Sequence, residues 1–152
     1  MYYLDSSSLI KIYIDETGSE WMRAVRERAA SDETLTCEIS GAEVFAAFHR
    51  RFRAGDLTGE ELQIACHLFK QDVDGFFTRL PVTKGIVDSS MTLIQKYPLR
   101  GYDAIQLTTA LSFFNELSQV NGELLNFVSA DKILNDAARS EGLTVINPSE
   151  QK

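Results

Sequence analysis

Five short apolar runs, which alternate with longer segments of helical periodicity, constrain the fold of this chain more than any other feature. The apolar runs, which we expect to be strands, lie at 2–4, 35–37, 76–82, 124–128 and 143–146. The segments between them repeat apolar residues every three or four positions, as helices that bury one face do. Such helices return the chain to the start of the next parallel strand. The pattern predicts a three-layer α/β/α sandwich with a mostly parallel central sheet.

The chain is expected to form a single domain over residues 1–152, because its length is typical of one domain and no linker-like stretch divides it. No apolar run approaches the roughly 20 residues that a membrane helix needs. The first residues lack the basic region of a signal peptide. Cys37 and Cys66 are too few for a disulfide framework, which favours a reduced, cytoplasmic protein.

The net charge of −7 restricts how the chain could bind nucleic acid. Proteins that grip DNA or RNA electrostatically do so with basic surfaces that displace counterions from the phosphates. An acidic protein can still bind phosphates if its carboxylates hold metal ions that supply the positive charge. The simpler alternative is that the excess acid only keeps the protein soluble.

Four of the 22 acidic residues occupy positions that solubility does not explain. Asp5 and Asp131 directly follow predicted strands, whose carboxyl ends lie at the ligand-binding edge of a parallel sheet. Glu43 shares a helical face with small apolar residues, and Asp103 begins the apolar stripe of another helix. Each has a structural alternative, as a helix cap, a first-turn acid or, for Glu43, a partner of Arg50. Together, the four are predicted to converge at one edge of the sheet.

Clustered carboxylates repel one another and raise one another's pKa unless a cation holds them together. A ligand set made of oxygen atoms suits Mg²⁺ or Mn²⁺ better than zinc. His49 and His67 are too isolated in the sequence to form a zinc site. The residues therefore predict a site for a hard divalent cation.

Four stretches of the sequence carry a family resemblance. They are YLDSSSLIKIYIDETGSE, EISGAEVFAAFHRR, LRGYDAIQLTTAL and FVSADKILNDAARSEGLTVINP. In this order and at these separations they resemble the PIN-domain family, and more narrowly its VapC-type toxin ribonucleases of bacterial and archaeal toxin–antitoxin pairs. The segment at 57–92 contributes nothing to the resemblance.

The resemblance implies an activity and a set of site residues. The catalytic and metal-ligating acids of the family fall on Asp5, Glu43, Asp103 and Asp131. The residues that support them fall on Ser7 and Ser129. The implied protein is an Mg²⁺- or Mn²⁺-dependent endoribonuclease, in which a metal-activated water hydrolyses RNA phosphodiester bonds. Its implied partners are an RNA substrate, a cognate antitoxin protein and a second copy of the chain.

Two alternative functions remain open at this stage. A PIN-like scaffold would bind RNA or protein without cutting, although an intact acidic quartet argues against it. A structure-specific DNA nuclease is also compatible, because water attack activated by a metal ion does not involve the 2′-hydroxyl. A dehalogenase-like phosphatase is disfavoured, since it needs a second aspartate where this chain has Ser7.

Two expectations concern the surface. A homodimer is predicted because one small core would not comfortably bury the many aromatic side chains, among them Phe45, Phe48, Phe69, Phe113 and Phe114. The helices at 9–13 and 21–25 are candidates to line a groove for apolar anchors of the antitoxin.

Overall fold

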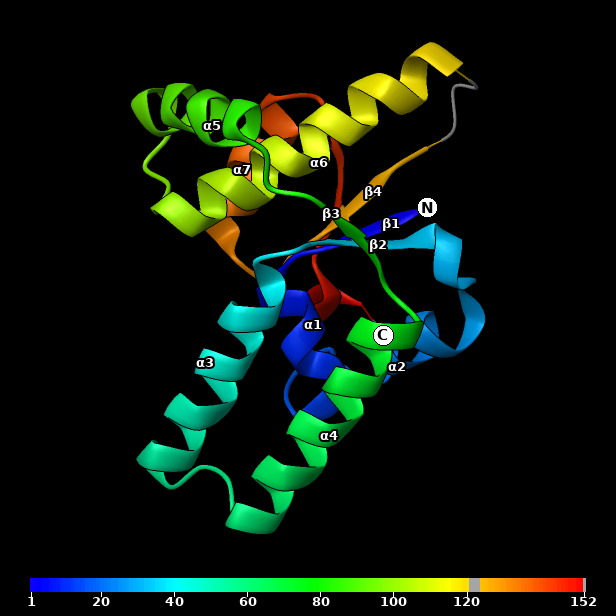
Figure 1. Cartoon of the computed structure of the whole chain (residues 1–152), viewed down its shortest axis with the longest axis vertical. Helices are drawn as coiled ribbons and strands as arrows, with labels where there is room; N and C mark the ends of the chain where they lie inside the picture. Colours follow the sequence, from blue (N-terminus) through cyan, green and yellow to red (C-terminus); the bar gives the residue numbers. More distant parts are fainter. Residues whose placement is uncertain (121–123, 152) are drawn as a thin grey trace.

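The computed structural model describes residues 1–120 and 124–151, and the strands within these ranges form one five-stranded sheet (Figure 1). The strands are β1 (Tyr2–Leu4), β2 (Thr34–Cys37), β3 (Thr78–Leu80), β4 (Asn126–Val128) and β5 (Thr144–Ile146). Their order is β3-β2-β1-β4-β5, and every neighbouring pair is parallel. The predicted sheet is confirmed, with β1 at its centre.

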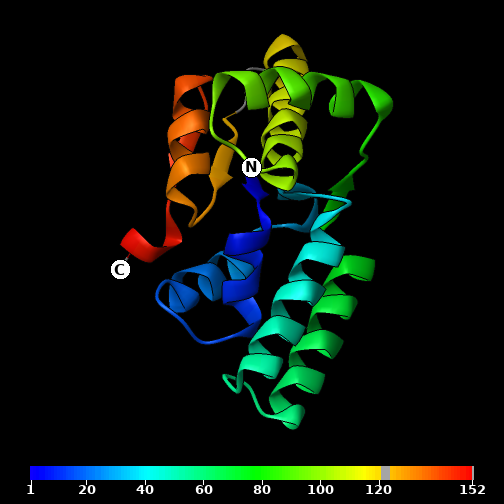
Figure 2. The same ribbon diagram turned by 90° about the vertical axis from the view of Figure 1, so that its left-hand side faces the viewer.

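Helices cover both faces of the sheet. They are α1 (Ser6–Tyr13), α2 (Ser19–Arg28), α3 (Ser40–Ala54), α4 (Gly59–Gly75), α5 (Lys84–Lys96), α6 (Gly101–Val120) and α7 (Lys132–Ser140). The first four pack on one face, and α5, α6 and α7 pack on the other (Figures 1 and 2). This arrangement is the predicted α/β/α sandwich. Within the described residues, none of the helices is long and apolar enough to cross a membrane.

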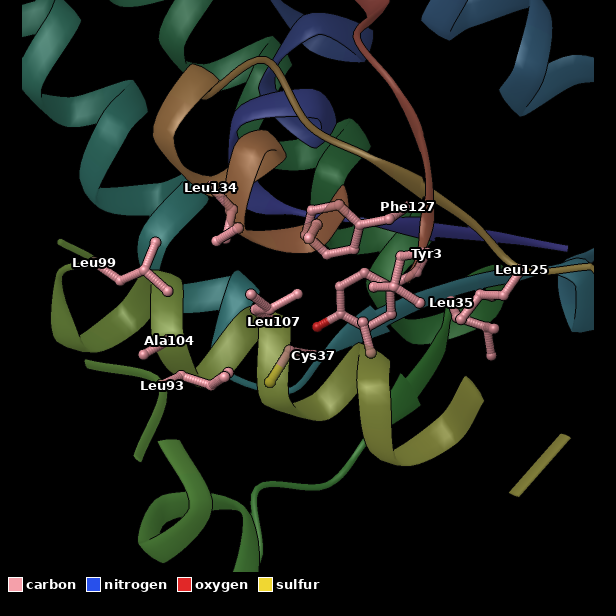
Figure 3. Close-up of a cluster of buried hydrophobic side chains, with 14 residues drawn as sticks. Tyr3, Leu35, Cys37, Leu93, Leu99, Ala104, Leu107, Leu125, Phe127 and Leu134 are labelled. Carbon is pink, nitrogen blue, oxygen red and sulfur yellow. The ribbon is translucent and has the colours of Figure 1, made fainter. Parts of the chain in front are cut away.

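Adjacent side chains of β1 belong to two different cores, because successive residues of a strand point to opposite faces. Tyr3 is buried on the face that α6 and α7 cover, and its ring stacks on Phe127 with the centroids 5.5 Å apart (Figure 3). Leu4 is buried on the other face, in the same cluster as Val44 and Phe48 of α3. The central strand therefore reads as a continuous apolar run rather than an alternating one.

The structure corrects the boundaries of two predicted strands. The strand predicted at 76–82 spans only Thr78–Leu80, because Phe76 still caps α4 by donating its N–H to the Asp72 carbonyl. The strand predicted at 124–128 begins at Asn126, and the Leu124 side chain is 74% exposed. Apolar residues that flank a strand thus extend its sequence pattern beyond the residues that pair in the sheet.

Some of the side chains that were expected at the surface lie in the core instead. Phe48 and Phe69 are buried, while the other phenylalanines assigned to a dimer surface pack partly against the cores. Leu9 and Met22 are buried where α1 meets α2. Other residues of these two helices line surface cavities, because Trp21 and Val25 of α2 border one of about 250 Å³ and Tyr13 of α1 borders one of about 420 Å³. A groove for antitoxin anchors on α1 and α2 therefore stays a prediction.

Candidate active site

One cavity of about 520 Å³ opens at the carboxyl edge of the sheet. Its lining includes all four predicted site acids, Asp5, Glu43, Asp103 and Asp131. Two of these residues follow β1 and β4, which are neighbours in the sheet, and the others lie in the first turns of α3 and α6. The parallel topology thus brings together residues that are far apart in the sequence.

Asp5 is the most buried of these acids, with 4% of its surface exposed. It caps α1, because its Oδ1 accepts the Ser8 N–H at 2.8 Å. Burial raises the pKa of Asp5 to about 6, and the hydrogen bonds from Ser8, Ser7 and Ser129 limit this rise. Asp5 therefore sits where a neighbouring positive charge would strongly favour its ionised form.

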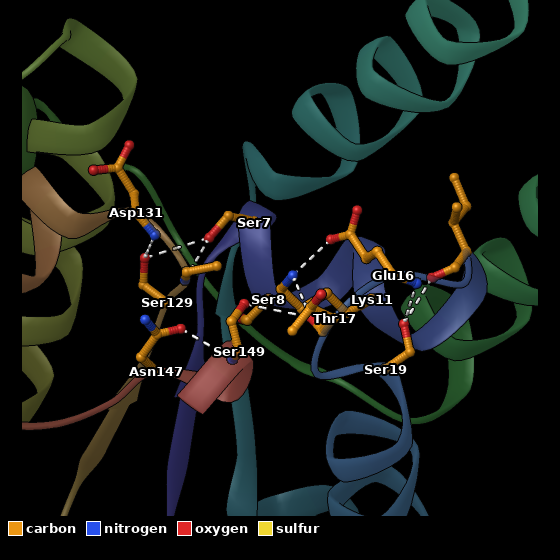
Figure 4. Close-up of polar contacts among 12 residues, drawn as sticks. Ser7, Ser8, Lys11, Glu16, Thr17, Ser19, Ser129, Asp131, Asn147 and Ser149 are labelled. Atoms are coloured by element: carbon orange, nitrogen blue, oxygen red, sulfur yellow. Dashed lines mark hydrogen bonds and ion pairs between the residues drawn. The ribbon is translucent and has the colours of Figure 1, made fainter. Parts of the chain in front are cut away.

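Ser7 and Ser129, the predicted supporting residues, both contact Asp5. The Ser7 hydroxyl lies 2.8 and 2.9 Å from the two carboxylate oxygens, and the Ser129 hydroxyl donates to Oδ2 at 2.9 Å. The Ala130 N–H donates to the Ser7 hydroxyl. The Asp131 N–H donates to the Ser129 hydroxyl (Figure 4). Since the amides occupy the acceptor side of each hydroxyl, the hydroxyl protons face Asp5.

The ionisation of Asp5 is expected to make the stability of the metal-free protein depend on pH. Because its pKa is raised from 3.8 to about 6, the folded protein binds the proton more tightly than the unfolded chain does. Protonated Asp5 thus adds up to about 3 kcal/mol to the free energy of unfolding. This contribution is complete below pH ~4 and is lost as the pH rises through ~6. Asp5→Asn removes this titration. Urea denaturation in EDTA should show the variant gaining stability over the wild type between pH 4 and 7. A difference in the free energy of unfolding that does not change with pH would contradict the raised pKa of Asp5.

Glu43 is held at one of its two carboxylate oxygens. Its Oε2 accepts hydrogen bonds from the Ser6 hydroxyl and, at 2.7 Å, from Nε2 of Gln106. Arg50, which the sequence offered as its partner, lines the same cavity but makes no ion pair with Glu43 in the described structure. Glu43 is therefore oriented by neutral groups rather than by a salt bridge.

Arg100 lies between Asp103 and Asp131. Its Nε is 2.8 Å from Oδ2 of Asp103, and its Nη2 is 3.5 Å from Oδ2 of Asp131. Asp131 also caps α7, because its Oδ1 accepts the Leu134 N–H at 3.0 Å. The cap uses only one oxygen of Asp131, so the capping position predicted from the sequence is compatible with a role in the cavity.

The donor set at the cavity fits a hard divalent cation. Mg²⁺ is commonly bound by one or two carboxylates, with waters and phosphate oxygens completing its octahedron. The buried Asp5 and the nearby Asp103 and Asp131 offer carboxylate oxygens, while His49 and His67 are exposed and lie outside the cavity lining. As they are arranged in the described residues, no three Asp, Glu, His or Cys side chains form a group that could hold a metal ion.

The sequence analysis missed four polar residues that line the cavity, namely Ser6, Arg100, Tyr102 and Gln106. Tyr102 is 61% exposed beside Asp103, so its ring is available to a ligand. Gln106 left a signal in the sequence, as a polar residue inside the apolar face of its helix. The other residues left none, because serines and arginines next to acids are common in surface turns.

Comparisons with known proteins agree with this architecture. A family model described as "PIN domain" matches residues 2–140. The structure of FitAB bound to an IR36 DNA fragment superposes with a TM-score of 0.69 and 15% identity, covering 100% of this chain and 98% of that chain. FitAcB from Neisseria gonorrhoeae gives a TM-score of 0.68 and 16% identity, covering 99% and 100%.

A third solved structure, a toxin–antitoxin complex from Klebsiella pneumoniae, gives a TM-score of 0.62 and 18% identity, covering 99% of this chain and 100% of that chain. At such identities the likeness concerns the fold. A search of curated protein sequences finds no significant match.

Proposed function

The chain belongs to the PIN-domain family, and we propose that it is a metal-dependent endoribonuclease. We further propose that it forms a single domain and is the toxin of a toxin–antitoxin pair. PIN domains are generally nucleases, which places the proposal within the chemistry of the family. The observation that carries it is the convergence of four carboxylates on one cavity at the sheet edge. The fold shared with a toxin–antitoxin complex supports the toxin role.

We assign the four acids to distinct roles. Asp5 and Asp103 would bind Mg²⁺ or Mn²⁺ directly, and Asp131 would complete the coordination shell through water. Such a cation, when bound, lowers the pKa of a water and offsets charge on the phosphate and the leaving oxygen. Glu43, held at Oε2, would ligate the metal ion or orient the attacking water. Ser7 and Ser129 keep the Asp5 carboxylate in one orientation through their hydroxyl donors.

A cleavage assay tests the proposed reaction. The purified protein is incubated with total RNA, and separately with single-stranded and duplex DNA, in Mg²⁺, in Mn²⁺ and in EDTA. We expect discrete RNA products that vanish in EDTA, with ends that map to defined positions. Binding of RNA without cutting would instead support a scaffold, and cutting of DNA alone would support a DNA nuclease.

We also propose that the working unit is a homodimer. An exposed apolar surface on α5 supports the homodimer, because Val87, Met91 and Ile94 of that helix are 41%, 53% and 42% exposed. These residues are four and three positions apart, so they form one apolar stripe. Sedimentation is expected to show a dimer at micromolar concentration, and Met91→Glu is expected to shift it to monomer. A monomeric wild type would contradict the proposal.

A further inference from the structure

Gln106 is a neutral side chain buried at the wall between the cavity and the core. It lies on α6, three residues after Asp103, and only 2% of its surface is exposed. A buried amide is destabilising unless its donors and acceptor are all used. The partners of Gln106 therefore show what the residue is placed to hold.

The hydrogen bonds of the Gln106 amide fix which of its ends faces Glu43. Its Nε2 donates to Oε2 of Glu43 at 2.7 Å and to the Ser40 hydroxyl at 2.8 Å, and Ser6 Oγ lies 3.0 Å away. Its Oε1 accepts the Tyr3 hydroxyl at 2.8 Å. Because an ionised carboxylate can only accept hydrogen bonds, Nε2 is the end of the amide that must face Glu43.

Tyr3 anchors the far end of the amide. Its side chain is fully buried in the core and stacks on Phe127 (Figure 3). Burial raises the pKa of Tyr3 well above its ordinary value, so the hydroxyl keeps its proton and donates to Gln106. The hydrogen bonds thus run from the central strand, through Gln106 on α6, to Glu43 on α3.

The hydrogen bonds from Gln106 and Ser6 use only one of the two carboxylate oxygens of Glu43. Oε2 takes both hydrogen bonds, from Gln106 and Ser6, while Oε1 has no hydrogen-bond partner among the described residues. A carboxylate fixed at one oxygen presents the other in a constant direction. Precise placement of such a group governs turnover more than it governs substrate binding.

We propose that Gln106 is a positioning residue, which holds the Glu43 carboxylate for its role at the metal-bound water by a hydrogen-bond chain anchored at Tyr3. The inference rests on the proposed nuclease function. It differs from a purely structural role, in which the amide would only satisfy the hydroxyls of Tyr3 and Ser40.

The test compares Gln106→Leu, which removes the hydrogen bonds, with Gln106→Glu, which keeps the shape but places an acceptor against Glu43. Thr109→Val is the matched control, because Thr109 is a buried polar residue of the same helix that bonds to the Ile105 carbonyl and lies outside the cavity. Each protein is assayed for kcat and KM on an RNA oligonucleotide. Mn²⁺ affinity is measured separately by calorimetry and by electron paramagnetic resonance.

Both Gln106 variants are expected to lower kcat by about 10- to 100-fold, and to weaken Mn²⁺ binding, with KM changed less than about threefold. Thr109→Val should match the wild type in all three quantities. If Gln106→Leu does not fold, Gln106→Glu and Tyr3→Phe, which retain side-chain shape, carry the comparison. Wild-type kcat and Mn²⁺ affinity in the folded Gln106 variants would overturn the proposal.

The Mn²⁺ readout separates this inference from the function on which it rests. A wild-type protein that binds Mn²⁺ but cuts no RNA would overturn the nuclease proposal. The Mn²⁺ affinities of the Gln106 variants would then still decide whether the amide positions Glu43, with an unchanged affinity counting against it.

Discussion

Asp5→Asn and Asp103→Asn are each expected to reduce RNA cleavage by more than about 100-fold while the fold stays intact. Replacing a residue that merely supports a metal ligand typically lowers activity or metal affinity 10- to 100-fold, so loss of a ligand charge should have a larger effect. Both side chains line the cavity, and the amide would preserve their shape. Cleavage rates at saturating Mg²⁺, with thermal unfolding followed by circular dichroism, provide the measurement.

Asp136→Asn is the matched control for this experiment. Asp136 is an acid of α7 close to the site in sequence, but it pairs with Lys132 and Arg139 and lies outside the cavity lining. Its replacement should leave cleavage within about twofold, as surface changes usually do. Substantial residual cleavage in both Asp5→Asn and Asp103→Asn would remove them from the proposed metal site.

The second large effect is expected from the cognate antitoxin, which we expect a gene beside that of this chain to encode. At stoichiometric concentration it should suppress RNA cleavage completely. The cavity contains four acids and the chain has a net charge of −7, which suits a basic inhibitor segment. Arg100 already places a guanidinium between Asp103 and Asp131. A guanidinium supplied by the inhibitor could make the same charge-assisted hydrogen bonds and take the place of the metal's charge.

Titration of this inhibitor against cleavage at two Mg²⁺ concentrations tests the mechanism. Competition for the carboxylates predicts that a tenfold rise in Mg²⁺ raises the inhibitor concentration needed for half inhibition, and that added salt weakens binding. Replacing the basic residues of the inhibitor segment by alanine should abolish inhibition. Tight binding with no loss of cleavage would show that the inhibitor does not occupy the cavity.

Local patterns in the sequence were sufficient to predict most of the elements. Between the predicted strands, α5 begins at Lys84 with Thr83 as its N-cap, and Gly55, at a positive φ of 85°, ends α3. Such signals are local, because a cap or a left-handed glycine acts within one turn. The ends of β3 and β4 were less predictable, since pairing in a sheet depends on a neighbouring strand.

The positions of the individual acids in the sequence predicted the acidic site only in part. Asp5 and Asp131 are helix caps in the structure, as their structural alternatives required, and they also line the cavity. A cap uses one carboxylate oxygen and leaves the other for a neighbour, so a residue can be a helix cap and also belong to the site in the cavity. The resemblance to the PIN-domain family, which the family match confirms, predicts that the four acids belong to one site.

The sequence by itself therefore determined the layers, the parallel sheet and which acids lie at its carboxyl edge, because periodicity and chain connectivity dictate these. Only the tertiary structure decided which side chains touch across elements. It put Phe48 and Phe69 in the core, and it set Gln106 of α6 against Glu43 of α3. The physical reason is that these contacts depend on how two helices pack against one strand, and no local pattern in either helix encodes that geometry.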